Sequence, residues 1–150
     1  MGTSLIKLPK RKNRAGRPTR YADLNDASPL KLMARMEAGF EFSLLISFQK
    51  TALLSVEEIG DLVRIPLRTL SRRKREGKLR ADESERLWRA IRVVDKAVAL
   101  FEGNKVAAMQ WLQTPQPALE LRTPLQFARS DVGAREVEEL IGRLEHGVFT

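Results

Sequence analysis

The sequence predicts an all-α fold from about residue 28 to the C-terminal end. Apolar residues recur at spacings of three and four along this part of the chain, which is typical of amphipathic helices. Residues that favour helix N-caps stand before these stretches, and glycines that favour helix ends follow several of them. No segment alternates apolar and polar residues with period two over any length, so we expect helices with some extended connections.

Residues 1–27 form a separate, basic part of the chain. The stretch from Lys7 to Tyr21 has almost no apolar residues, two prolines and many charges, a composition that does not bury enough surface to fold. We expect a flexible arm here. Insertion into a DNA minor groove and a nonspecific solvated tail are both open interpretations of it.

The first helix is expected to start at Ser28, as N-cap, with Pro29 in the first helical position, and to end at Gly39. Ser43 is expected to cap a second helix near residues 44–53. The inward face of that helix carries Leu45, Phe48 and Ala52.

A third and a fourth helix follow closely. Ser55 and Glu58 have the spacing of a capping box, in which each side chain accepts a hydrogen bond from the other residue's amide, and this starts a helix near residues 56–64. The next helix is expected near residues 67–76, with Gly77 at its end. The residues expected to face inward on these two helices are Ile59, Leu62, Val63, Leu67 and Leu70.

Residues 81–102 give the strongest helix pattern, ended by Gly103. Acidic residues gather near its start, where they stabilise the helix dipole. Its apolar positions recur at spacings of four and three, at Leu87, Ile91, Val94, Val98 and Phe101. Asn104 is expected to cap a further helix that stops before Pro115.

The remaining chain is expected to hold two more helices after an irregular, proline-rich connection. Thr123 and Pro124 fit the N-cap and first position of a short helix. Gly133 is interpreted as a turn residue with positive φ. A last amphipathic helix ends at Gly147 and carries Val137, Leu140, Ile141 and Leu144 on its apolar face.

Basic residues, 27 against 19 acidic ones, give a net charge of +8 and lie in two islands. Residues 1–22 carry seven basic residues and no acid, and residues 64–80 carry eight basic residues and one acid. Residues 81–150 are slightly acidic. This asymmetry predicts a polyanionic partner for one part of the protein and a different partner for the other.

The residue types exclude several classes of function. Without cysteine the chain has no disulfide, Cys-based metal site or Cys nucleophile, and a reducing cytoplasm suits it. A single His, no Gly-rich phosphate loop and no Ser-His-Asp arrangement point to no enzyme, no metal and no cofactor. No apolar run approaches the roughly 20 residues that cross a bilayer, and no apolar segment follows the basic N-terminus as in a secretory signal. We expect a cytoplasmic protein.

The three short helices near residues 44–53, 56–64 and 67–76 have the shape of a helix-turn-helix unit, whose third helix enters the major groove by its N-terminal residues. Residues 68–78 carry six basic residues and one acid, whereas a merely solvated helix usually mixes both signs. Arg suits guanine edges and phosphates, and Lys suits phosphates. The third helix is therefore expected to bind DNA with outward-facing or sideways-facing Arg68, Thr69, Ser71, Arg72, Arg73, Lys74, Arg75 and Lys78.

The chain from about residue 43 to 150 resembles Xre-type antitoxins of bacterial toxin–antitoxin operons. The helix-turn-helix part is carried by "RTLSRRKREGKL" followed by "ESERLWR". The end of the chain resembles the toxin-binding domain of the Xre/MbcA/ParS antitoxins. The residues that carry this second resemblance are Ala108, Trp111, Leu112, Pro115, Pro117, Leu119, Thr123, Pro124, Leu125, Gly133, Val137, Leu140, Arg143, His146, Gly147 and Val148.

Composition sets apart the basic arm at 1–27, and the helix pattern together with this resemblance divides the rest into a DNA-binding domain at 28–103 and a toxin-binding domain at 104–150. The resemblance implies that the chain blocks the active site of a RES-type toxin that degrades NAD⁺ and represses its own operon. Because helix-turn-helix proteins usually bind paired half-sites as dimers, we expect a homodimer and a higher hetero-oligomer with toxin. The residues expected at the toxin are Arg143, His146, Gly147, Val148, Phe149 and Thr150. The alternative is a helix-turn-helix transcription regulator whose C-terminal domain only dimerises.

Overall fold

The computed structural model describes residues 24 and 26–147, and the elements of this part are helices joined by turns and short connections. Two isolated antiparallel bridges, Glu41 with Lys78 and Gln116 with Arg122, are its only β pairings within the described residues. The elements in order are α2 (Pro29–Ala38), α3 (Phe42–Thr51), α4 (Val56–Val63), α5 (Leu67–Glu76), α6 (Ala81–Leu100), α7 (Lys105–Leu112), the 3₁₀ turn η3 (Pro117–Leu119), α8 (Pro124–Phe127) and α9 (Asp131–Glu145).

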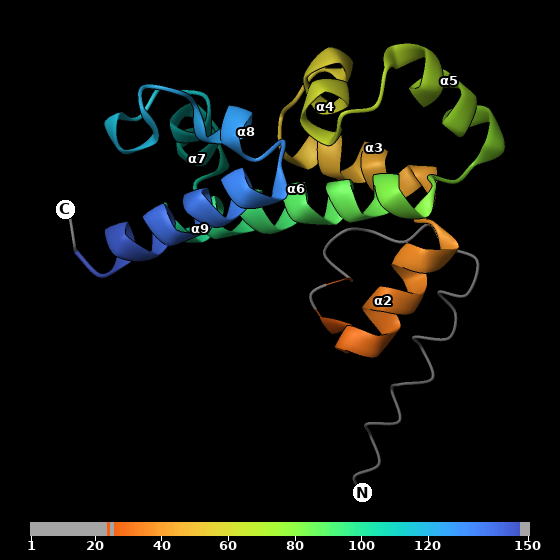
Figure 1. Cartoon of the computed structure of the whole chain (residues 1–150), viewed down its shortest axis with the longest axis horizontal. Helices are drawn as coiled ribbons and strands as arrows, with labels where there is room; N and C mark the ends of the chain where they lie inside the picture. The colour runs from red at the N-terminus through yellow and green to blue at the C-terminus, as the bar shows by residue number, and fades with distance from the viewer. Residues whose placement is uncertain (1–23, 25, 148–150) are drawn as a thin grey trace, which may run out of the picture.

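The long helix α6 runs through the middle of the molecule and organises the rest (Figure 1). Helices α2 and α4 pack against its first half, and α7 and α9 pack against its second half. Its apolar stripe is buried as predicted at Leu87, Ile91 and Val94, whereas Val98 and Phe101 are half-buried. One continuous set of buried residues, from Leu24 to Ile141, joins both halves around α6.

Most of the predicted helix starts are confirmed. The side chains of Ser28 and Asn104 accept hydrogen bonds from the amides three residues on. Ser55 with Glu58 forms the predicted capping box. Thr123 forms a second box with Gln126 at the start of α8. These side chains satisfy amides that a helix leaves without an internal partner.

The predicted start of α3 at Ser43 is wrong, because the helix begins at Phe42 with Glu41 as N-cap. The amide of Phe42 donates to the carbonyl of Gly77 at 3.0 Å, and the amide of Leu79 donates to the carbonyl of Phe40 at 2.8 Å. This pairing between the segments that precede α3 and follow α5 fixes where the chain turns into α3. Ser43 therefore lies within the helix.

Gly133 is not a turn residue with positive φ, as the sequence interpretation had it, but lies in the first turn of α9 after the N-cap Ser130. A Cβ atom at this position would stand 2.0 Å from the carbonyl oxygen of Phe127. The glycine is needed because the end of α8 crosses the start of α9 at close range. The connection predicted as irregular, in turn, contains the 3₁₀ turn η3.

The arm predicted at 1–27 ends earlier than expected, since Leu24 is 1 % exposed and belongs to the core. The other residues of the predicted arm up to 23, and residue 25, lie outside the described residues. Within the described residues no helix combines the length and the hydropathy that a membrane span needs.

Candidate nucleic-acid interface and C-terminal groove

Helix α5 follows α4 after a tight turn, in which Arg64 caps α4 in the left-handed conformation at φ 57°. Fewer apolar residues of α5 face inward than predicted. Leu70 is buried, but Leu67 is 48 % exposed because it lies at the first position of the helix, beyond the edge of the core. The N-terminal turn of α5 thus presents an apolar side chain to the outside.

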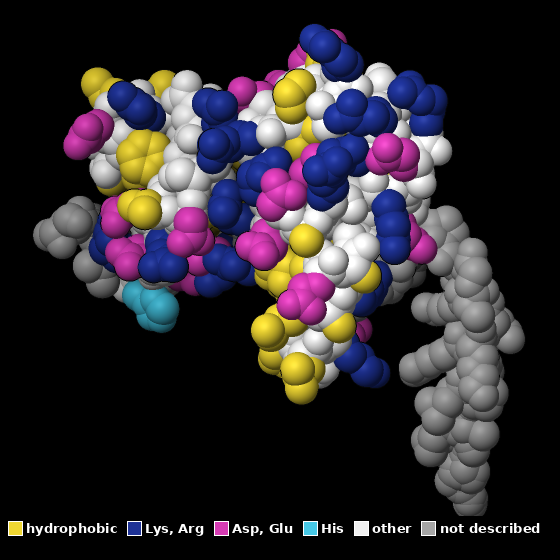
Figure 2. All heavy atoms as spheres, turned by 45° about the vertical axis from the view of Figure 1, so that its right-hand side comes forward, with side chains coloured by type: hydrophobic (Ala, Val, Ile, Leu, Met, Phe, Trp, Pro, Cys, Tyr) yellow, Lys and Arg dark blue, Asp and Glu magenta, His cyan; other side chains and the backbone are white. Residues whose placement is uncertain are grey.

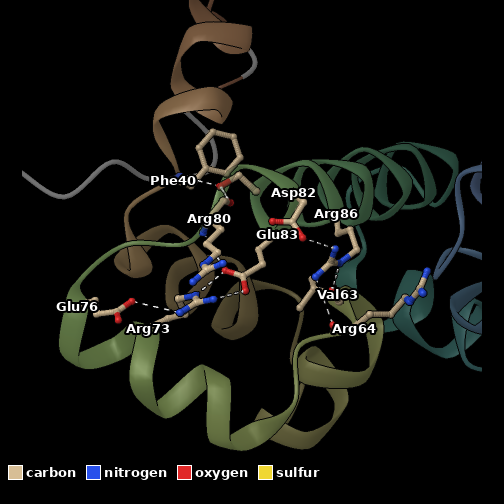
Figure 3. A network of polar contacts seen from close by, with 10 residues as sticks. Phe40, Val63, Arg64, Arg73, Glu76, Arg80, Asp82, Glu83 and Arg86 are labelled. Atoms are coloured by element: carbon tan, nitrogen blue, oxygen red, sulfur yellow. Dashed lines mark hydrogen bonds and ion pairs between the residues drawn. The ribbon is translucent and has the colours of Figure 1, made fainter.

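Arg73 does not face outward as predicted but is 3 % exposed. Its Nε and Nη2 atoms donate to the two carboxylate oxygens of Glu83 at 2.7 and 2.9 Å, and Nη1 donates to Glu76 at 3.2 Å (Figure 3). Glu83 is 5 % exposed and also accepts from the amide of Arg80 at 2.8 Å. Because its guanidinium is turned inward and paired, Arg73 holds α5 against the start of α6 and does not belong to the exposed basic face.

The charges of this buried pair stabilise each other. Burial by itself raises the pKa of Glu83, but hydrogen bonds from the Arg73 guanidinium and the Arg80 amide lower it overall. The hydrogen bond to Glu83 raises the pKa of Arg73. Both groups are therefore ionised at neutral pH, and neither is left without a partner.

The other predicted DNA-binding residues remain on the surface. Thr69 is half-buried and the rest are exposed, namely Arg68, Ser71, Arg72, Lys74, Arg75 and Lys78. Within the described residues no ion pair neutralises any of these five basic side chains. Figure 2 shows basic side chains gathered on the part of the surface that α5 forms. An exposed, unneutralised basic helix of this kind suits a polyanion.

Arg86 of α6 fastens the turn before α5. Its Nε donates to the carbonyl of Val63 at 2.6 Å, its Nη2 donates to the carbonyl of Arg64 at 3.4 Å, and Nη1 pairs with Asp82 at 3.2 Å (Figure 3). Burial acts to raise the pKa of Asp82, and the hydrogen bond from Arg86 lowers it overall. The last carbonyls of α4 are thereby satisfied by a cation.

At the other end of the chain, Arg143 and His146 line one shallow groove of about 460 Å³ together with Glu139 and Gly142. Nδ1 of His146 lies 2.8 Å from the carbonyl oxygen of Gly142, and because a carbonyl oxygen only accepts, Nδ1 is the donor. Gly147 follows with φ 73°. The structure thus brings Arg143 and His146 together, whereas Val148, Phe149 and Thr150 lie outside the described residues.

The two tryptophans, Trp88 and Trp111, are both half-buried against the core. The ring of Trp111 lies 6.3 Å from that of Phe101, measured between centroids, at an interplanar angle of 51°. Sequence reasoning missed the role of Glu83, which looked like one of several acids near a helix start. No sequence signal links it to an arginine ten residues earlier, across a turn.

Comparison with known proteins gives two family matches, one in each half of the chain. The chain matches the family of the antitoxin Xre-like helix-turn-helix domain over residues 32–92. It matches the family of the antitoxin Xre/MbcA/ParS C-terminal toxin-binding domain over residues 96–147. The first match stops and the second begins inside α6, so one continuous helix serves both.

Three curated proteins called antitoxin Xre are similar over most of the chain. The one from Yersinia enterocolitica is 41 % identical over 120 residues, which cover 79 % of this chain and 81 % of that protein. The one from Photorhabdus laumondii is 37 % identical over 120 residues, with the same coverage. The one from Pseudomonas putida is 33 % identical over 122 residues, which cover 81 % of this chain and 75 % of that protein.

Proposed function

Because the chain belongs to the Xre family of antitoxins, we propose that it neutralises a RES-type, NAD⁺-degrading toxin and represses its own operon. Family membership makes it a binding protein with a cognate toxin as partner, and not an enzyme. The RES class of the toxin is an inference from the resemblance of residues 43–150. The observation that supports the inhibitory role most directly is the match of residues 96–147 to a toxin-binding domain.

The proposed toxin contact is the end of α9 and the residues that follow it. Arg143 and His146 share the C-terminal groove with the acid Glu139. A guanidinium at this place suits an acidic residue or a phosphate subsite of the toxin. His146 can accept a hydrogen bond through Nε2. Residues 147–150 then enter the toxin's active site and exclude its substrate.

The test is co-expression of the chain with the toxin encoded beside it, with growth and cellular NAD⁺ as readouts. Deletion of residues 145–150 is expected to abolish protection, and Arg143→Ala with His146→Ala is expected to weaken it. Arg135→Ala is the matched control, since Arg135 lies on the same helix and pairs with Asp131 at 2.8 Å. Full protection by the deleted chain contradicts the proposed contact. A toxin that leaves NAD⁺ intact contradicts its RES class.

We propose that α5, with Lys78 just beyond its end, binds operator DNA. Arg68, Thr69, Ser71, Arg72 and Arg75 are assigned to base edges and phosphates, and Lys74 and Lys78 to phosphates. The family match to a helix-turn-helix domain and the unneutralised basic face support this assignment. Helix-turn-helix proteins usually read paired half-sites as dimers, so a homodimer and a larger complex with toxin are proposed as well. Sedimentation of the chain with and without toxin measures both.

A regulator whose C-terminal domain only dimerises remains the competing function. It predicts that deletion of residues 145–150 disrupts the homodimer and that the neighbouring gene product never binds the chain. The match of residues 96–147 to a toxin-binding domain favours the antitoxin.

A further inference from the structure

The turn between α8 and α9 is fastened to the turn of the helix-turn-helix. Nε of Arg129 donates to the carbonyl of Asp61 at 3.2 Å, and its Nη2 lies 3.5 Å from the Asp61 carboxylate. In return, Nη1 of Arg64 donates to the carbonyl of Arg129 at 3.4 Å, and Nη1 of Arg89 approaches the same oxygen at 3.5 Å. Residue 129 belongs to the part that matches a toxin-binding domain, and residues 61 and 64 belong to the part that matches a helix-turn-helix domain.

This contact forms one wall of a groove of about 340 Å³ at the N-terminal end of α5. Among the described residues, Arg129 is the one lining residue from the C-terminal half. The others come from α4, the turn and the first residue of α5, namely Glu57, Gly60, Asp61, Arg64, Ile65, Pro66 and Leu67. Because a recognition helix enters the major groove by its N-terminal residues, side chains beside that end lie next to a DNA backbone.

Arg64 and Arg129 differ in how their positive charges are neutralised. Arg64 is exposed, and within the described residues no carboxylate lies within ion-pair distance of it. It is also held in the left-handed conformation, which is uncommon for a residue other than glycine. Arg129 pairs with Asp61, but both side chains are largely exposed, at 45 % and 66 %, so the pair is weak.

The acids Glu57 and Asp61 line the same groove, so its formal charge is balanced when no anion is present. A phosphate can take the place of Asp61 at Arg129, because the guanidinium binds phosphate and carboxylate in the same bidentate manner.

Behind Arg129 several cationic side chains lie close together. Burial lowers the pKa of Arg89, Asp131 opposes this, and repulsion from Arg86 and Arg64 lowers it further. Figure 2 shows basic side chains continuing from α5 across the centre of the visible face, with acidic ones between them.

We propose that Arg129 of the toxin-binding domain, together with Arg64, binds a phosphate of the DNA strand that passes the N-terminal end of α5. The DNA interface then extends over both halves of the antitoxin. This inference rests on the proposed binding of operator DNA by α5.

The experiment uses the full chain and two labelled duplexes, one with the region upstream of its own gene and one of random sequence and equal length. Binding is titrated by fluorescence anisotropy between about 0.05 and 0.3 M salt for the wild type, Arg129→Gln, Arg64→Gln, Asp61→Asn and Arg68→Gln. Loss of one phosphate contact is expected to lower the slope of log K against log salt by about one, for each of the two groove arginines. Asp61→Asn is expected to strengthen binding several-fold, because it frees Arg129 for phosphate.

Two controls distinguish a phosphate contact from a purely structural role of Arg129, in which it only holds the two turns together. Lys105→Gln removes a positive charge at the start of α7, beyond the far end of α6, and is expected to leave the slope unchanged. Thermal unfolding of each variant shows whether the fold is intact. If Arg129 is only a strut between the two turns, Arg129→Gln changes stability or affinity at an unchanged salt slope, and Asp61→Asn weakens binding.

The outcomes also distinguish this inference from the proposed function. If Arg68→Gln lowers the slope and Arg129→Gln does not, α5 binds DNA and the extension to the C-terminal half is wrong. If wild type binds the two duplexes equally well and Arg68→Gln has no effect, sequence recognition by α5 is itself wrong. Reduced salt slopes for Arg64→Gln, Arg68→Gln and Arg129→Gln together support both the binding of operator DNA by α5 and the phosphate contact at Arg64 and Arg129.

Discussion

Arg73 and Glu83 join α5 to α6 through two parallel hydrogen bonds, of 2.7 and 2.9 Å, between side chains that are both nearly inaccessible to solvent. Within the described residues, the other main attachments of α5 are its packing on α4 and the pairing of residues 77–79 with residues 40–42. The helix proposed to enter a DNA groove is thereby attached to α6 by an internal ion pair. The pair explains why an arginine in the most basic part of the chain has no solvent-facing role.

Breaking this pair on one side is expected to be costly. Glu83→Gln leaves the buried Arg73 guanidinium with only the half-exposed Glu76 as counter-charge, and we expect a loss of about 3 kcal/mol in the free energy of unfolding. Urea unfolding measures this value. The double variant Arg73→Met with Glu83→Leu removes both charges and is expected to recover most of the loss. A double variant as unstable as Glu83→Gln would show that the pair itself, and not the uncompensated charge, carries the stability.

The stability of the fold is expected to depend on acid through Glu83. The pKa of Glu83 in the folded protein lies below its ordinary value. The pair therefore makes its full contribution to the free energy of unfolding above roughly pH 4 to 5, where the carboxyl group of the unfolded chain is also ionised. The contribution is lost as pH falls from there through the depressed folded value. Unfolding midpoints measured from pH 7 to 3 should fall for the wild type. They should fall less for the double variant without the pair.

Exposed and buried arginines of α5 are expected to act on DNA binding differently. Arg68→Gln and Arg72→Gln each remove an exposed charge and should lower the salt slope by about one, with the unfolding midpoint unchanged. Arg73→Gln should lower the unfolding midpoint instead, because its partner Glu83 is left buried. Equal effects of Arg72→Gln and Arg73→Gln on both measurements would contradict this division.

Two glycines on α9 offer a matched pair. Gly133→Ala places a methyl group against the Phe127 carbonyl, and we expect a loss of about 1–3 kcal/mol despite the better helix propensity of alanine. Gly142→Ala meets nothing within 4 Å and is expected to stabilise by up to about 1 kcal/mol. Thermal unfolding compares them. The close crossing of α8 and α9 is refuted if both substitutions stabilise.

Both halves are expected to unfold together, because α6 supplies core residues to each. Trp88 lies on α6 within the helix-turn-helix match and Trp111 lies on α7, so the variants Trp111→Phe and Trp88→Phe leave one reporter in each half. Their fluorescence midpoints in urea should coincide with each other and with the loss of helical circular dichroism. Two separate midpoints would show that the halves are independent folding units.

Local signals predicted the helices well because they act within a few residues. Caps at Ser28, Ser55, Asn104 and Thr123 and the apolar spacing of α6 depend on neighbours three or four positions away. The prediction of Ser43 as the N-cap of α3 is wrong, because a pairing with the distant residues after α5 decides where this helix begins. Gly133 was read as a turn because its actual constraint, the carbonyl of Phe127, becomes visible only when the two helices cross.

The sequence predicted which helix faces carry the candidate sites, but it did not predict which side chains pair with the residues on them. The basic character of α5 and the shared groove of Arg143 and His146 follow from composition and helical spacing. The inward turn of Arg73 depends on Glu83, and the role of Arg129 depends on Asp61, 68 positions earlier. Such pairs require the tertiary arrangement, since nothing in the local sequence distinguishes a buried arginine from its exposed neighbours.

The length of α6 has a further consequence for how many ligands one molecule holds. Its 20 residues span about 30 Å, with α5 near its start and the end of α9 beyond its other end (Figure 1). The proposed operator contact and the proposed toxin contact therefore lie toward opposite ends of this helix (Figure 1). We expect a ternary assembly, in which the antitoxin stays on the promoter while it carries the toxin.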